Sequence, residues 1–237
     1  MKRRIWELDA FRGICILGVI FVHLVFDATV LYGLIDIQIP AWFQVLQQWG
    51  GILFVLLSGI CVTLGRHSLK RGLVVFGCGL LVSAATYGMY LVQMADKGII
   101  IYFGVLHCLG TCMVLWGGLK RLPTWALAIL GAVMAATGLY LMGRSFENAP
   151  LWTMLLGVRP ALNMGDYFPL LPHLGFFLLG AVIGRTAYAR KTTLLPKVNE
   201  KTPVLRFLTF CGRNSLWIYL GHQPILAGAL YLLTLTK

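Results

Sequence analysis

Apolar residues run along this chain in long stretches that are separated by short polar and basic segments. A hydrocarbon core of about 30 Å requires about 20 apolar residues of α-helix to cross it, and each stretch is close to that length. The pattern therefore predicts an all-α fold, a polytopic transmembrane helix bundle of about seven helices. The predicted spans are residues 11–31, 44–65, 72–93, 99–118, 124–143, 168–186 and 214–235.

The first span carries ionisable side chains that lipid-facing helices avoid. Arg12, His23 and Asp27 lie within it, and a charge at the bilayer centre costs about 3 kcal/mol or more. At about 100° per residue, Arg12 and His23 project within about 20° of each other. Asp9 and Asp27 both lie within about 60° of Arg12. This polar stripe predicts a site inside the membrane, with Arg12 near one membrane face and His23 past the middle.

Composition and charge set the class of protein and its orientation. Of the 237 residues, 59% are hydrophobic and 12% are charged, which excludes a soluble domain. With the N-terminus in the cytoplasm, the inner segments hold 14 basic residues and the outer segments hold four. This bias predicts a cytoplasmic N-terminus, an extracytoplasmic C-terminus and a multi-pass protein of the plasma membrane. Because the basic residues are scattered over several loops, membrane lipids are expected as partners and nucleic acid is not.

Three histidines lie at similar depths in other spans. His107, His173 and His222 fall in the outer half of the predicted bundle, where they could meet in one cavity. Each could instead form a hydrogen bond between helices, which is common in membranes. Asp166 stands before a helix start that two prolines mark. That helix start either offers its N–H groups to an anionic substrate or a developing oxyanion, or is an ordinary capped end.

The last span follows a polar break in the chain. Arg213 and Asn214 interrupt an apolar segment, which predicts a short interfacial piece before the final helix. On that helix Ser215, Tyr219 and His222 share one face.

The six cysteines lie in or beside apolar spans, where cysteine behaves as a small hydrophobic residue. Cys108 and Cys112 share a helix face beside His107, but no C-x-x-C pair or second ligand cluster accompanies them. We therefore predict no metal.

Short motifs follow one another in a specific order along the chain. They comprise Leu8, Asp9, Phe11, Arg12 and Gly13 followed by His23; Leu57, Ser58 and Gly59; the segment 166–172; and Gly212, Arg213, Asn214, Ser215, Leu216, Ile218, Tyr219, His222, Gln223 and Pro224. Together they resemble bacterial relatives of the heparan-alpha-glucosaminide N-acetyltransferase family, from end to end. Arg12, ten intervening residues and His23 also resemble the membrane-bound acyltransferase-3 proteins, a looser relation.

The resemblance implies a single transmembrane acyltransferase domain over residues 1–237. Such a protein takes an acetyl group from cytosolic acetyl-CoA and delivers it to an amine or hydroxyl of an extracytoplasmic sugar or glycan. The lysosomal member of this family has more helices than this chain. It has asparagine at the position of His23, and its catalytic histidine lies in the next luminal loop. This chain has no histidine between Leu24 and Arg66, so His23 takes that role only through the acyltransferase-3 pattern.

These patterns lead to expected roles for individual residues. We expect His23 to act as the catalytic base and Asp27 to orient its ring, although an acetyl-histidine intermediate and a purely interhelical hydrogen bond are alternatives. Arg12 is expected to guide CoA, with Asp9 as its partner at rest. The other expected CoA-binding residues, at the inner mouth, are Arg66, Lys70, Arg71, Lys120, Arg121, Arg213 and Asn214. The expected substrate-binding residues are His107, Asp166, His173, Ser215, Tyr219 and His222.

Two other functional classes stay open at this stage. A proton-coupled carrier or channel would use histidines and carboxylates to relay protons. A non-catalytic membrane assembly or sensor protein would use the polar stripe only for packing. Acetyl-CoA turnover distinguishes an enzyme from both. The expected partners are lipids and a carbohydrate acceptor, with a homodimer as a candidate assembly.

Overall fold

The computed structural model describes residues 4–94, 96–142, 144, 150–158 and 166–235, and every regular element within them is helical. Its contacts divide the chain into two compact units. Unit 1 consists of Met1–Phe54 and Lys191–Lys237, and unit 2 consists of Val55–Arg190. The prediction of one domain over residues 1–237 stays a prediction.

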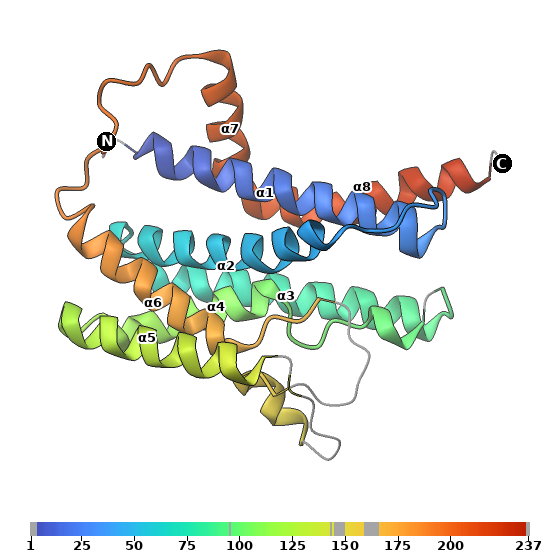
Figure 1. The fold of residues 1–237 in the computed structure, drawn as a ribbon, viewed down its shortest axis with the longest axis horizontal. Coiled ribbons are helices and arrows are strands. Elements are labelled where there is room, and N and C mark those ends of the chain that lie inside the picture. The colour runs from blue at the N-terminus through green and yellow to red at the C-terminus, as the bar shows by residue number, and fades with distance from the viewer. Residues whose placement is uncertain (1–3, 95, 143, 145–149, 159–165, 236–237) are drawn as a thin grey trace. The chain divides into compact units, whose positions relative to one another are not determined.

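Unit 1 is built around the first helix. It contains α1 (Trp6–Phe26), the π-helical turn η1 (Asp27–Leu31), the first part of α2 (Ala41–Leu64), α7 (Pro203–Arg213) and α8 (Ser215–Thr234). Both α7 and α8 pack against α1, with α8 running beside it and α7 crossing near its N-terminal end (Figure 1).

Glycines allow the close contact between α1 and α7. A Cβ atom at Gly212 would overlap the carbonyl oxygen of Asp9, and one at Gly13 would overlap the carbonyl oxygen of Leu208. Small residues let membrane helices pack backbone against backbone, so these two glycines set the position of α7 on α1.

Unit 2 is made of paired helices. It contains the rest of α2, then α3 (Ser68–Leu91), η2 (Lys97–Ile99), α4 (Val105–Leu119), α5 (Thr124–Leu141), η3 (Leu151–Leu156) and α6 (Leu170–Thr186). Helix α3 packs on α4, and α5 packs on α6. Glycine again permits close contact, since a Cβ atom at Gly59 of α2 would overlap the Phe177 carbonyl oxygen of α6.

The predicted spans coincide with helices of the structure. Among the described residues, five helical segments are long and apolar enough to cross a membrane: Trp6–Leu31, Ala41–Leu64, Ser68–Leu91, Thr124–Leu141 and Ser215–Thr234. The helices α4 and α6 are apolar but shorter, with 15 and 17 residues. The class of membrane helix bundle is therefore confirmed, whereas the number of crossings and the orientation of the termini stay predictions.

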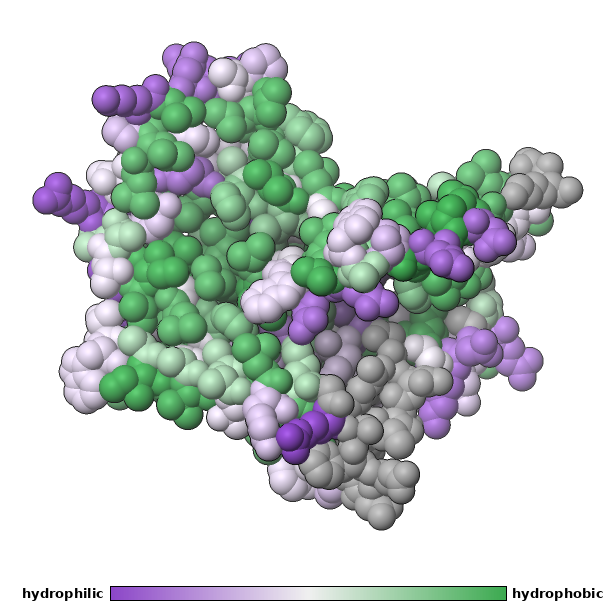
Figure 2. All heavy atoms as spheres, in the orientation of Figure 1, coloured by the Kyte–Doolittle hydropathy of each residue, from purple (hydrophilic) through white to green (hydrophobic). Residues whose placement is uncertain are grey.

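Large apolar side chains are exposed along the long helices of both units. In unit 1, Phe11 and Ile14 of α1 and Trp217 of α8 are more than half exposed. Hydrophobic residues accordingly cover much of the face drawn in Figure 2. This is the surface that a protein needs when lipid chains, rather than water, surround its helices.

Candidate active site

Four polar side chains meet where α8 packs on the C-terminal part of α1, inside unit 1. The ring of His23 packs edge-on against that of His222, with 4.9 Å between the ring centroids. The next residue of α8, Gln223, donates a hydrogen bond from Nε2 to Oδ2 of Asp27 at 2.8 Å. Residues four apart on a helix lie on one face, so His23 and Asp27 can both face α8. Asp27 is only 2% exposed and His222 only 7%.

The backbone sets the protonation pattern of the His222 ring. Its Nδ1 is hydrogen-bonded to the carbonyl oxygen of Tyr219, and because a carbonyl can only accept, Nδ1 carries the hydrogen. In the neutral ring Nε2 then holds the lone pair that can accept a proton. The Tyr219 ring also packs on His222, at 5.1 Å between centroids, so these two members of the predicted polar face are in contact.

The expected contact between Asp27 and the ring of His23 is not formed. Within the described part of the chain, no hydrogen bond joins the two residues, and the carboxylate accepts from Gln223 instead. Helical periodicity places His23 and Asp27 on one face but does not say which residue of a distant helix lies opposite them. Gln223 belongs to the last of the sequence motifs, but the sequence pattern assigns it no role. Its place beside His222 in an apolar helix is the signal that could have identified it.

At the other end of α1, Asp9 pairs with Arg213 rather than with Arg12. Oδ2 of Asp9 lies 3.1 Å from Nε of Arg213, so the predicted resting pair of Asp9 and Arg12 is wrong. The reason is the packing of Gly212 on Asp9, which brings the end of α7 to this carboxylate. Nε of Arg12 is buried without a hydrogen-bond partner among the described residues. An anionic ligand would supply the missing acceptor.

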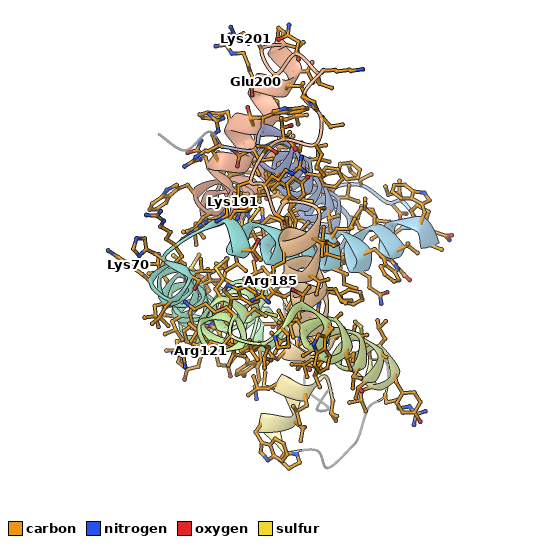
Figure 3. All side chains as sticks on the ribbon, turned by 90° about the vertical axis from the view of Figure 1, so that its left-hand side faces the viewer. Lys70, Arg121, Arg185, Lys191, Glu200 and Lys201 are labelled. Carbon is orange, nitrogen blue, oxygen red and sulfur yellow. The ribbon has the colours of Figure 1, made fainter. Side chains whose placement is uncertain are left out.

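A second carboxylate of α1 holds the loop that leads to α7. Glu7 accepts hydrogen bonds from Oγ1 of Thr193 and from the backbone N–H of Leu194, both at 2.8 Å. The same loop carries Lys191, Glu200 and Lys201, which Figure 3 labels. Glu7 thus holds the start of this loop against α1, the helix that carries Arg12 and His23.

In unit 2, His107 supports the start of α4. Its Nδ1 accepts the Gly104 N–H at 3.3 Å, and its Nε2 lies 3.4 Å from Oγ of Ser83. Oδ2 of Asp166 accepts the neighbouring Val105 N–H at 3.1 Å. Asp166 therefore caps α4, whereas the residue that precedes α6 at its N-cap is Pro169.

His173 supports the start of α6 in a similar way. Its Nδ1 lies 2.7 Å from the carbonyl oxygen of Pro169, its ring packs on Phe168, and it is 3% exposed. His107 thus contacts Ser83 of another helix, as the interhelical alternative expects, whereas the described contacts of His173 are with the residues just before its own helix. The predicted convergence of these two histidines with His222, which belongs to unit 1, stays a prediction.

The predicted CoA-binding cations are divided between the units. Arg66, Lys70, Arg71, Lys120 and Arg121 are exposed at the turns of unit 2, whereas Arg213 and Asn214 belong to unit 1. Arg185 organises one of these turns. It donates to the carbonyl oxygens of Leu122 and Lys120 at 2.7 and 2.5 Å, and its guanidinium lies 5.0 Å from the centroid of the Trp116 ring. Figure 3 labels Arg185 and Arg121. The structure thus holds the Lys120–Arg121 turn in place.

The described residues contain no group of three or more histidine, cysteine or acidic side chains that could hold a metal ion. Cys108 and Cys112 are buried free cysteines.

A comparison with models of known protein families shows which family the chain belongs to. A family model described as "Heparan-alpha-glucosaminide N-acetyltransferase, catalytic" matches residues 4–224. The chain belongs to this family. No curated protein and no solved structure matches it.

Membership in the heparan-alpha-glucosaminide N-acetyltransferase family gives the site a chemical context. Four residues, His23, Asp27, His222 and Gln223, form what we call the α1–α8 cluster. The matched region includes all four of them, and it also includes Arg12, Asp9 and Arg213. Together with the five long apolar helices of the described residues, the match makes the chain a membrane protein of an N-acetyltransferase family, and so of the transferase class.

Proposed function

We propose that this protein is an acetyl-CoA-dependent acetyltransferase of the plasma membrane. It would move an acetyl group from cytosolic acetyl-CoA to an amine or hydroxyl of an extracytoplasmic sugar or glycan. The observation that carries the proposal is the cluster of His23, His222, Asp27 and Gln223 between two apolar helices of a chain that belongs to this family. Buried polar groups inside membrane helices mark functional sites because packing alone does not require them.

The proposed chemistry needs one base and one bound thioester. His23 removes the proton of the acceptor N–H or O–H group, the acceptor nitrogen or oxygen bonds to the thioester carbonyl carbon, and the carbon–sulfur bond breaks. The released CoA thiolate then takes up a proton. A positioned general base contributes typically about 10² to 10⁴ in rate. In the two-step alternative, the His23 ring first receives the acetyl group and the acceptor then displaces it.

The donor side of the site is proposed at the inner end of α1. Arg12 has a buried Nε that lacks a partner in the described residues, and Asp9 is already paired with Arg213. A phosphate or polar group of the CoA arm would therefore meet a guanidinium without having to displace Asp9 from it. Separately, the exposed turns of unit 2 with Arg66, Lys70, Arg71, Lys120 and Arg121 are proposed to attract CoA phosphates.

Removing two of these cations should weaken acetyl-CoA binding selectively. In the double variant Arg66→Ala, Arg71→Ala, the affinity for acetyl-CoA should fall by about tenfold, and by less for the analogue that lacks the 3′-phosphate, because each lost cation removes a charge-assisted contact. Equilibrium binding to the purified protein measures the affinities for the two donors. Arg144→Ala, which removes a cation stacked on Tyr140, should change neither affinity. Equal losses for the two donors would show that Arg66 and Arg71 do not bind that phosphate.

The proposed function can be tested with sided vesicles. In inside-out vesicles that hold an amino sugar in the lumen, labelled acetyl-CoA added outside should yield labelled acetylated sugar in the lumen. Acetyl-CoA sealed in the lumen with the sugar outside should yield none, because the proposed orientation presents the CoA side to the cytoplasm. Flux of a solute or proton without acetylation would instead favour a carrier. Absence of acetyl transfer in both arrangements would contradict the proposal.

A further inference from the structure

Gln223 belongs to the α1–α8 cluster, although neither the family likeness nor the proposed chemistry gives it a role. Its Nε2 donates to Oδ2 of Asp27 at 2.8 Å. One turn later on α8, the carbonyl oxygen of Ala227 accepts a hydrogen bond from the Tyr32 hydroxyl at 3.1 Å. These two contacts hold one face of α8 against the end of α1. They therefore restrict where the Gln223 side chain can point.

A glutamine amide has one end that donates hydrogen bonds and one end that accepts them. Because an ionised carboxylate only accepts, the contact with Asp27 assigns Nε2 to that side and leaves Oε1 on the other side of the amide. Oε1 is buried and has no hydrogen-bond partner among the residues that the structure describes. Buried acceptors in folded proteins almost always have a partner, so an exception requires an explanation such as a functional role.

We propose that Oε1 of Gln223 accepts a hydrogen bond from the reacting amine or hydroxyl of the acyl acceptor, and that Asp27 holds the amide in this orientation. This inference rests on the proposed function, because it assigns a ligand to the same site. The missing partner must carry a hydrogen. Ionised phosphates and a thioester carbonyl do not, so these parts of acetyl-CoA are excluded.

The amide N–H groups of the pantetheine arm could also donate to Gln223. The acceptor is favoured because the cluster contains His23, to which the acceptor N–H or O–H must come in order to lose its proton. Gln223 would then bind a second hydrogen of an amine, or position a hydroxyl, beside the base. Gln223 would act as an acceptor-binding residue, and Asp27 as a positioning residue that acts through it.

Equilibrium binding to the purified full-length protein tests this assignment without turnover. The probes are glucosamine, 2-deoxyglucose, which lacks only the amine at carbon 2, and acetyl-CoA. The parent protein should prefer glucosamine to 2-deoxyglucose. Gln223→Met keeps the length of the side chain but removes both amide ends. It should lower the affinity for glucosamine by about tenfold, and should leave the affinities for 2-deoxyglucose and acetyl-CoA unchanged.

Two further variants keep the test decisive. Gln47→Met makes the same replacement at an exposed position of α2 in unit 1, and it should alter none of the three affinities. Gln223→Glu retains an oxygen acceptor at the end of the side chain. Two carboxyl groups this close share one proton, which preserves the hydrogen bond to Asp27, so this variant should retain the preference for glucosamine. If Gln223→Met does not fold, the Gln223→Glu variant carries the test, and loss of the preference in it overturns the assignment.

The assignment is also overturned if the parent binds the two sugars equally or binds neither. The assignment is overturned as well if folded Gln223→Met keeps the preference for glucosamine. It is also overturned if this variant loses affinity for acetyl-CoA and not for glucosamine. These results are separable from the proposed function. A protein that shows the Gln223-dependent preference but transfers no acetyl group refutes only the proposed enzyme activity. One that transfers acetyl groups with the preference unchanged in Gln223→Met refutes only the role of Gln223.

Discussion

Replacing His23 with alanine should leave a folded protein that binds acetyl-CoA but transfers acetyl groups about 10² times more slowly, or slower still. The half-buried ring lies in the apolar part of α1, against His222, and no described hydrogen bond ties it to the fold. Its loss should therefore remove the proposed base without destabilising the helix. Rates of transfer from labelled acetyl-CoA, measured beside donor binding and thermal unfolding, give the comparison.

The neighbouring residues provide the controls for this result. Asp27→Asn should lower the rate less than His23→Ala, because the asparagine oxygen can still accept the hydrogen bond of Gln223. A folded His23→Ala protein with the parental rate would exclude His23 as the base. The search would then move first to His222, whose Nδ1 contact with Tyr219 makes Nε2 the acceptor nitrogen of the neutral ring.

Gly212→Ala should destabilise unit 1 by about 1–3 kcal/mol. The added Cβ atom would overlap the carbonyl oxygen of Asp9, and backbone atoms of two packed helices cannot move as freely as the end of a side chain. The strain should separate α7 from α1 and disturb the ion pair between Asp9 and Arg213. A lower apparent Tm of the detergent-purified protein, together with slower acetyl transfer, is the expected result.

The same substitution at Gly228 is the matched control. Gly228 lies in α8, and the place that a Cβ atom would occupy there is open, since it has no neighbouring atom within 4 Å. Alanine favours helix over glycine by about 1 kcal/mol, so Gly228→Ala should leave Tm unchanged or raise it slightly. A Gly212→Ala protein as stable as Gly228→Ala would show that α7 does not pack on Asp9 as closely as described.

Much of the helical architecture follows from local sequence patterns. Each of the predicted apolar spans contains a helix, because helix formation in a membrane depends on a continuous apolar segment that satisfies its own backbone. The predicted helix starts are less accurate. The span predicted at 99–118 begins as α4 only at Val105, since Lys97–Ile99 forms a separate 3-10 turn and Asp166 caps the later start.

The polar stripe of α1 was likewise predictable, because helical periodicity is a property of one segment. Arg12, His23 and Asp27 lie on one helix and its π-helical extension, as expected. The family likeness, which depends on the order of short motifs, also came from the sequence and agrees with the family match over residues 4–224.

Only the tertiary structure decided which side chains meet. Asp9 pairs with Arg213, 204 residues away, rather than with Arg12. Asp27 binds Gln223, 196 residues away, and Asp166 caps a helix 61 residues earlier. Sequence determined the class of the protein, its helices and the polar face of α1, because these depend on composition and on spacing within a segment. The partners of that face depend on how distant helices pack, and two glycines of α1 and α7 set part of that packing.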